Sequence, residues 1–171
     1  MANVDRADGF TVMAPVCPLQ PYDVVVTNAP AFFVGDCVVA GTVGATGDGN
    51  VAPSTDGSEI KIIGATTSKL ATLTAGTVKV FDDQDQRYTV QGVTGTASAQ
   101  TMVHNASDTS VTAGDANTGL SRHELLVSTV STSAGQWKIH DIANIIGQTL
   151  AEHARFVVRP NEHINKLVAG I

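Results

Sequence analysis

Apolar and polar residues alternate in short runs along most of this chain, and turn-forming residues separate the runs. Alternation with a period of two places every second side chain on the same face of an extended strand, so each run predicts a β-strand. Glycine, proline, asparagine and aspartate between the runs favour turns and loops. The predicted strands cover residues 22–27, 32–40, 59–65, 77–81, 87–93, 123–130, 136–142 and 154–159.

Two polar connecting segments lead to specific predictions. Segment 82–86 is short and separates strands 77–81 and 87–93, so these two strands are predicted to form a β-hairpin. Segment 106–119 contains few apolar residues and is predicted to be a surface loop.

Helical structure is an alternative in two places. Segment 94–105 fits either a turn of helix or a strand. A second short helix is an alternative where apolar residues recur at helical spacing, although Gly147 disfavours it. The residues with this spacing are Ile142, Ile145, Ile146 and Leu150.

The first part of the chain has a different character from the rest. Residues 1–21 contain Pro15, Pro18 and Pro21 and show little periodicity. Proline has no backbone N–H for a ladder bond, so this segment is predicted to be an extended N-terminal arm rather than a central strand. No repeat or linker divides residues 22–171, which are predicted to form a single β domain.

Composition supports an all-β fold. The chain contains 22 Val, 20 Thr and 9 Ile, the β-branched residues that suit a pleated, half-buried surface. About nine short strands with turn signals between them are typical of β-sandwiches and barrels. We therefore predict a compact β-sandwich or β-barrel, jelly-roll-like, with an extended N-terminal arm.

Charge argues against a nucleic-acid partner. Charged residues make up 15% of the chain, and the net charge is −6. Residues 1–60 hold one basic residue, Arg6, and seven acids, whereas residues 61–171 hold nine of each. Phosphate binding needs clustered Lys and Arg, and the sequence has no such cluster. The acidic first third is either a solvated face or a surface for a basic protein.

The sequence also gives expectations about the compartment. Asp5, Arg6 and Asp8 interrupt any apolar region of a signal peptide, and no apolar run reaches the length of a membrane span. We expect a soluble chain, made in the cytoplasm, with no membrane partner. Cys17 and Cys37 lack metal-ligand spacing and could form a disulfide, but two free, packed thiols are expected in a cytosol.

The histidines offer only fragments of metal sites. His123 and Glu124 begin like the zinc metalloprotease helix motif, but Val127 stands where the second histidine is required. His153 lies near Glu162 and His163 in the sequence, without ligand spacing on a defined element. His140 and Asp141 lack such spacing too, so these side chains are expected to be structural or exposed and no metal or other cofactor is predicted.

Other chemical signatures are equally incomplete. Asp82, Asp83 and Asp85 could offer oxygens to Ca²⁺, but the central Gly and distal Glu of a calcium loop are missing, which favours a charged turn. The sequence has no GxSxG nucleophile motif and no phosphate-binding loop. We therefore predict no catalytic residues and a protein that is not an enzyme. Trp137, the single Trp, is expected to be a core or interface anchor.

Four segments together resemble a family of small virion proteins of tailed bacteriophages, the capsid decoration or cement proteins. The opening 2–5 with Gly9-Phe10 is similar to their N-terminal arm, and 32–39 (FFVGDCVV) looks like one of their strands. Segment 78–86 (VKVFDDQDQ), followed by Val90-Gln91, is the most specific match, with Gln84 where the family usually has Pro. The C-terminal third resembles theirs at 119–121, 124–125, 128–129, 136–139, 154–158, Asn161, His163 and the final Gly-Ile.

The resemblance implies a β module that binds the outer surface of the assembled major capsid protein shell and stabilises it by connecting neighbouring capsomers. It implies a symmetric homo-oligomer, a trimer in preference to a dimer, because closed symmetry and avidity suit such a role. We expect the N-terminal arm to bind the capsid or a neighbouring protomer, and a chain lacking residues 1–15 to remain folded. The residues expected to make capsid or protomer contacts are Val4, Asp5, Phe10, Trp137 and Ile171.

Two other functions fit the same composition. One is another virion part, such as a tail, head-fibre or receptor-facing β protein, which would be present in far fewer copies than a decoration protein. The other is an enzyme or a carbohydrate-binding β-sandwich. A carbohydrate platform needs exposed aromatic rings, and the chain has only Trp137, Tyr22 and Tyr88 besides five Phe.

Overall fold

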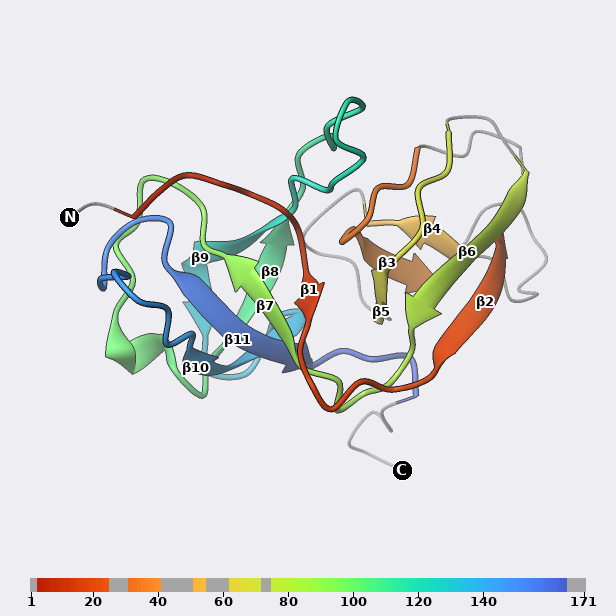
Figure 1. The fold of residues 1–171 in the computed structure, drawn as a ribbon. Coiled ribbons are helices and arrows are strands. Elements are labelled where there is room, and N and C mark those ends of the chain that lie inside the picture. The colour runs from red at the N-terminus through yellow and green to blue at the C-terminus, as the bar shows by residue number, and fades with distance from the viewer. Residues whose placement is uncertain (1–2, 25–30, 41–50, 55–61, 72–74, 166–171) are drawn as a thin grey trace.

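A computed structural model of the chain describes residues 3–24, 31–40, 51–54, 62–71 and 75–165 (Figure 1). These residues form eleven β-strands and one short 3-10 helix, η1 (Gln100–Met102). The all-β prediction is confirmed. None of the helical structure in the described ranges is long and apolar enough to cross a membrane.

The first of two antiparallel sheets has six strands. Its order is β1-β7-β11-β10-β8-β9. Strands that are distant in sequence therefore lie side by side, and the short β1 occupies one edge next to β7 (Figure 1). The strands are β1 (Thr11–Val12), β7 (Tyr88–Gln91), β8 (Ala106–Ser110), β9 (Glu124–Ser131), β10 (Trp137–Ile142) and β11 (Arg155–Pro160).

The second antiparallel sheet has five strands in the order β2-β6-β5-β3-β4. Neither sheet closes on itself within the described residues, so the architecture is the predicted sandwich rather than the barrel. The strands are β2 (Leu19–Val24), β3 (Cys37–Ala40), β4 (Val51–Pro53), β5 (Ile62–Thr66) and β6 (Gly76–Phe81).

The main hydrophobic core draws side chains from both sheets. Cys37, Ile62 and Phe81 from the five-stranded sheet belong to the same buried cluster as Tyr88 and Trp137 from the six-stranded sheet. A second buried cluster, which includes Val38, Ile63, Val78 and Val80, lies on strands of the five-stranded sheet. Adjacent residues such as Ile62 and Ile63 thus belong to different clusters, as expected for a strand with both faces covered.

The N-terminal arm is extended, as predicted, but it is integrated into the fold. Thr11 and Val12 pair with β7, and Leu19–Val24 pairs with β6 at the edge of the other sheet. Pro21 lies in this edge strand, where its missing N–H is tolerated. Phe10 is only 3% exposed and belongs to the main core. The expectation that residues 1–15 are dispensable for folding therefore conflicts with the structure.

The predicted hairpin of strands 77–81 and 87–93 is wrong. β6 pairs with β2 and β5, whereas β7 pairs with β1 and β11, so the connection passes from one sheet to the other. The Tyr88 hydroxyl donates a hydrogen bond to the Phe81 carbonyl (2.8 Å) across this connection. Gly64 permits close approach there, because a Cβ at this position would lie 2.0 Å from the Phe81 oxygen.

Two further predictions need correction. Residues 106–110 are a strand rather than part of a loop, because the buried hydroxyl groups of Ser107 and Thr109 bond within the sheet. The helix considered for 142–150 is absent: β10 ends at Ile142, and a series of turns follows. Segment 94–105 contains the short helix η1.

Candidate functional site

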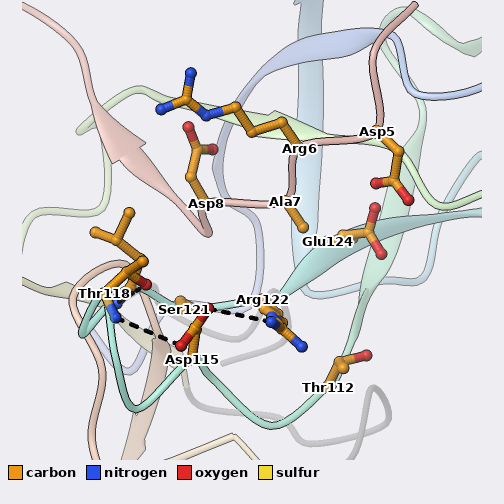
Figure 2. Close-up of a pocket in the computed structure, with 11 residues that line it drawn as sticks. Asp5, Arg6, Ala7, Asp8, Thr112, Asp115, Thr118, Ser121, Arg122 and Glu124 are labelled. Atoms are coloured by element: carbon orange, nitrogen blue, oxygen red, sulfur yellow. Dashed lines mark hydrogen bonds and ion pairs between the residues drawn. The ribbon is translucent and has the colours of Figure 1, made fainter.

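A pocket of about 500 Å³ lies between the N-terminal arm and the connection from β8 to β9 (Figure 2). Asp5, Arg6 and Asp8 line it from the arm. The opposite wall comes from the segment 112–124 and includes Asp115, Thr118, Ser121, Arg122 and Glu124. The lining thus includes charged side chains of both signs, together with the apolar Ala7 and Leu120.

Local bonds fix most of the charged groups around this pocket. Arg122 forms an ion pair with Asp115 at 3.2 Å, and Asp115 also accepts hydrogen bonds from the backbone N–H groups of Asn117 and Thr118. These N–H bonds are the main reason that the pKa of Asp115 lies below its usual value. Asp8 pairs with Arg155 at 2.8 Å. Asp115 and Asp8 therefore have cationic partners.

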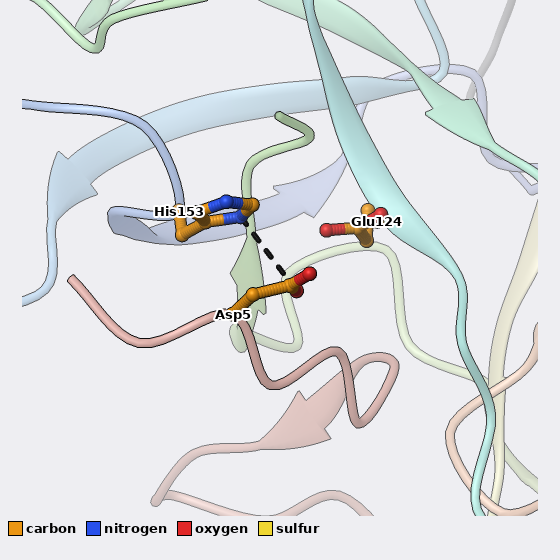
Figure 3. A group of neighbouring side chains, drawn as sticks. All are labelled: Asp5, Glu124 and His153. Atoms are coloured by element: carbon orange, nitrogen blue, oxygen red, sulfur yellow. Dashed lines mark ion pairs between the residues drawn. The ribbon is translucent and has the colours of Figure 1, made fainter. Parts of the chain in front are cut away.

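Asp5, Glu124 and His153 form a separate cluster at the edge of this pocket (Figure 3). One possible metal-ligand atom from each residue lies within 4.8 Å of the other two. Asp5 comes from the arm, Glu124 begins β9, and His153 precedes β11. His153 has a left-handed backbone (φ 58°), a conformation that is uncommon for residues other than Gly but in which Asn, Asp and His are enriched.

Gln91 lies behind the cluster and is 1% exposed. Its side-chain nitrogen donates hydrogen bonds to Asp5 Oδ1 (2.9 Å) and Glu124 Oε1 (3.1 Å), and it lies 3.2 Å from His153 Nδ1. Its side-chain oxygen accepts a hydrogen bond from the backbone N–H of Arg6 (2.9 Å). Gln91 thus positions both carboxylates and the arm at the same time.

The electrostatics of the cluster are dominated by the two carboxylates. Burial raises the pKa of Glu124, and the negative charge of Asp5 raises it further; the hydrogen bond from Gln91 opposes both effects. His153 Nδ1 lies 3.7 Å from Asp5 Oδ1. Two acidic oxygens and one imidazole nitrogen therefore converge at this point of the surface.

The arm also borders an apolar surface formed by Val4, Ile145 and Ile146. Val4 is 77% exposed and Ile146 is fully exposed, and all three residues line a second pocket. Asn3 fixes the arm against this region, because its side-chain nitrogen donates to the carbonyls of Thr149 (3.0 Å) and Glu152 (2.8 Å). An exposed group of apolar side chains held in place in this way is typical of an interaction surface.

A buried Ser-His-Asp group also occurs, but its geometry does not support nucleophilic catalysis. Asp36, Ser121 and His123 are 2%, 0% and 4% exposed. His123 Nε2 lies 3.6 Å from Asp36 Oδ1, and the Ser121 hydroxyl accepts a hydrogen bond from the His123 backbone N–H at 3.0 Å. A catalytic triad instead needs the histidine between the serine and the carboxylate, next to substrate. This group connects the segment before β3 to the segment before β9.

Two of the aspartates considered as calcium ligands have separate partners. Asp82 interacts with His163 Nε2 at 3.0 Å and accepts a hydrogen bond from Tyr22. Asp85 pairs with Arg159 at 2.7 Å. His153 and His163 are close in sequence but have different partners. His163 contacts Asp82, whereas His153 belongs to the cluster with Asp5. Cys17 and Cys37 are not joined by a disulfide.

The residues expected to contact a capsid or a protomer fall into three groups. Val4 and Asp5 are exposed on the arm, with the Asp5 side chain 69% exposed. Phe10 and Trp137 are buried in the main core at 3% and 0% exposure, so neither is available for a direct contact. Ile171 lies outside the described residues.

Sequence reasoning missed the contribution of Gln91, Glu124 and His153 to one cluster. As a possible metal ligand, Glu124 was considered because it follows His123, whose side chain is buried elsewhere. The members of the cluster are separated by tens of residues along the chain, so local spacing contains no signal for it. They meet where the end of β7 contacts the start of β9, through the isolated bridge between Gly92 and Leu125, and the turn before β11, through the hydrogen bond from the Gly92 N–H to the Ala154 carbonyl.

Comparisons of this chain with protein-family models, with curated proteins and with solved structures found no match.

Proposed function

We propose that this chain is a capsid decoration protein of a tailed bacteriophage. In this proposal it binds the outer surface of the assembled shell of major capsid protein and stabilises the shell by connecting neighbouring capsomers. It acts as a symmetric homo-oligomer, a trimer in preference to a dimer, so that several modest contacts are made together.

The observation that supports this proposal is that the segments resembling the decoration family contact one another. The Phe10 backbone N–H, from the arm segment, donates to the Gly35 carbonyl of the FVGD segment at 2.9 Å. Gly9 makes this approach possible, because a Cβ there would lie 2.5 Å from the Gly35 oxygen. Asp82, from the DDQDQ segment, interacts with His163 of the C-terminal segment.

Gln86, also from the DDQDQ segment, adds a second connection to the arm. Its side-chain nitrogen donates to the carbonyls of Met13 (2.7 Å) and Arg87 (2.9 Å), and its oxygen accepts from the Cys17 N–H (2.8 Å). Gln86 is 4% exposed. The similar segments thus form one structural framework around the arm, which is why we give weight to their resemblance as a set.

We assign the capsid contact to the apolar surface of Val4, Ile145 and Ile146. These side chains are exposed on the same part of the molecule as the fixed arm, and contact with a shell protein would remove them from water. Asn3 holds the neighbouring backbone, so little ordering of the arm would be needed on binding.

Binding of purified variants to capsid shells that lack the protein tests this proposal. Val4→Asp and Ile146→Asp should weaken binding by at least about tenfold, because each places a charge in a contact that must lose water. Val16→Asp is the matched control, since Val16 is an exposed arm residue (54%) outside this surface. Unchanged binding by both surface variants would refute the assigned contact, and no binding by the wild-type chain would refute the function itself.

A further inference from the structure

We propose that Asp5, Glu124 and His153 bind one divalent transition-metal ion, of which Zn²⁺ is the representative, through Asp5 Oδ1, Glu124 Oε1 and His153 Nδ1. Imidazole nitrogen together with carboxylate oxygen is a ligand set used by zinc and similar ions in proteins. This inference does not depend on the proposed capsid function.

The geometry needs only small side-chain adjustments. Around a four-coordinate zinc ion with bonds of about 2.0–2.1 Å, the ligand atoms lie roughly 3.4 Å apart. The three candidate atoms are within 4.8 Å of one another, and the distance from Asp5 Oδ1 to His153 Nδ1 is 3.7 Å. The Asp5 side chain is 69% exposed, so an ion can approach from solvent and keep water as a further ligand.

The charge of the cluster favours a cation. Within the described ranges, no lysine or arginine forms an ion pair with Asp5 or Glu124, whereas Asp8, Asp85 and Asp115 each have an arginine partner. Glu124 is half-buried and lies beside the Asp5 carboxylate. A bound cation would neutralise both carboxylates.

Gln91 provides the supporting shell that a metal site requires. Carboxylate ligands are usually held by hydrogen bonds from neighbouring groups, and these bonds fix their orientation. The buried Gln91 amide donates to the two carboxylate oxygens that would contact the ion. Its own oxygen is fixed by the Arg6 N–H, so the amide orientation is determined. Gln91 thus holds the cluster from the interior, with its nitrogen also 3.2 Å from His153 Nδ1, while the exposed Asp5 carboxylate faces solvent.

The consequence of binding is a cross-link between three parts of the chain. The ion would join the arm through Asp5, the first residue of β9 through Glu124, and the turn before β11 through His153. Since the ion binds the folded chain and not the dispersed ligands of the unfolded chain, it should stabilise the fold in proportion to its concentration.

Calorimetric titration of the chelator-treated full chain with ZnCl₂, together with thermal melting, tests this assignment. The wild-type chain should bind one Zn²⁺ and melt at a higher temperature with zinc present. Glu124→Gln and His153→Asn should bind at least about tenfold more weakly and lose the zinc-dependent stabilisation. Asparagine suits the left-handed backbone at position 153, so this variant removes the imidazole without adding backbone strain.

Glu152→Gln is the matched control. Glu152 lies next to His153, and its carboxylate contacts the Thr94 hydroxyl at 3.2 Å instead of the cluster. This variant should bind zinc as the wild type does. Melting of each variant without zinc shows whether it is folded. The proposal is overturned if the wild-type chain does not bind zinc, or if the folded Glu124→Gln and His153→Asn variants bind it with unchanged affinity.

Discussion

The ring of Phe10 stacks on the indole of Trp137, with ring centroids 4.2 Å apart and an interplanar angle of 20°. Tyr88 packs edge-on against both rings. The contact joins the N-terminal arm to β10 at the centre of the main core. The arm therefore stabilises the fold in addition to any part it plays in binding.

Replacing Phe10 by Ala should lower the free energy of unfolding by about 3–5 kcal/mol, because it removes a buried ring and leaves a cavity against Trp137. Deleting residues 1–15 should destabilise the chain at least as much, since β1 is lost as well. Chemical denaturation measures both changes. Phe10→Leu should lower the free energy of unfolding by less than Phe10→Ala does. A truncated chain with wild-type stability would contradict the assigned role of the arm.

Trp137→Phe tests a buried hydrogen bond. Trp137 Nε1 donates to the Thr109 hydroxyl at 2.9 Å, and Thr109 is 1% exposed. Losing this donor leaves a buried hydroxyl unsatisfied, so we expect a loss of about 1–3 kcal/mol in unfolding free energy beyond the change in packing. Adding Thr109→Val to Trp137→Phe removes the unsatisfied hydroxyl, so it should recover part of the lost unfolding free energy. Strictly additive effects in this double-mutant cycle would show that the two groups are not coupled.

Gly64→Ala should destabilise the chain far more than Gly76→Ala. A Cβ at position 64 would lie 2.0 Å from the Phe81 carbonyl oxygen, so the backbone itself must move. At position 76 the nearest atom is a terminal carbon of the flexible Leu70 side chain, at 3.0 Å. Thermal melting of the two variants compares these effects, and equal melting temperatures would argue against the close approach of β5 to Phe81.

The Asp82–His163 contact should make part of the stability depend on pH. The hydrogen bond from His163 lowers the pKa of Asp82 in the folded chain, helped by the Tyr22 hydroxyl and opposed by burial. The folded state therefore binds the proton less tightly than the unfolded state, and the stabilisation is lost as pH falls through the lowered pKa.

Asp82→Asn should accordingly reduce stability near neutral pH, and its difference from the wild type should shrink as the pH falls through the acidic range. Urea denaturation at a series of pH values measures this. If the difference in unfolding free energy between wild type and variant stays constant with pH, the contact of ionised Asp82 with His163 does not contribute to stability.

Alternation of apolar and polar residues was sufficient to predict the fold class and most strands. A strand that buries one face places an apolar residue at every second position, so its pattern can be recognised in the sequence. Strand 106–110 was missed because its inward-facing groups include hydroxyls that are satisfied only by partners from β9 and β10. The hairpin error has a similar origin: a short polar segment does not reveal that β6 and β7 pair in different sheets.

The candidate cluster could not be predicted for the same reason. Asp5, Glu124 and His153 are distant in sequence, and their proximity depends on the bridge that joins the end of β7 to the start of β9, between Gly92 and Leu125. Val4 and Asp5 were identified from the arm and are exposed, whereas Phe10 and Trp137 are core residues. Sequence reasoning located the arm without revealing which of its residues face inward.

The most direct test of the central claim is the copy number of this chain relative to major capsid protein in purified, DNA-filled particles of a phage whose genome contains its gene, measured by quantitative mass spectrometry. A decoration protein placed symmetrically over the shell predicts between about one copy per three capsid subunits and one copy per subunit. A ratio far below this range would indicate a tail or vertex component, and absence of the chain from particles would contradict a structural role in the virion.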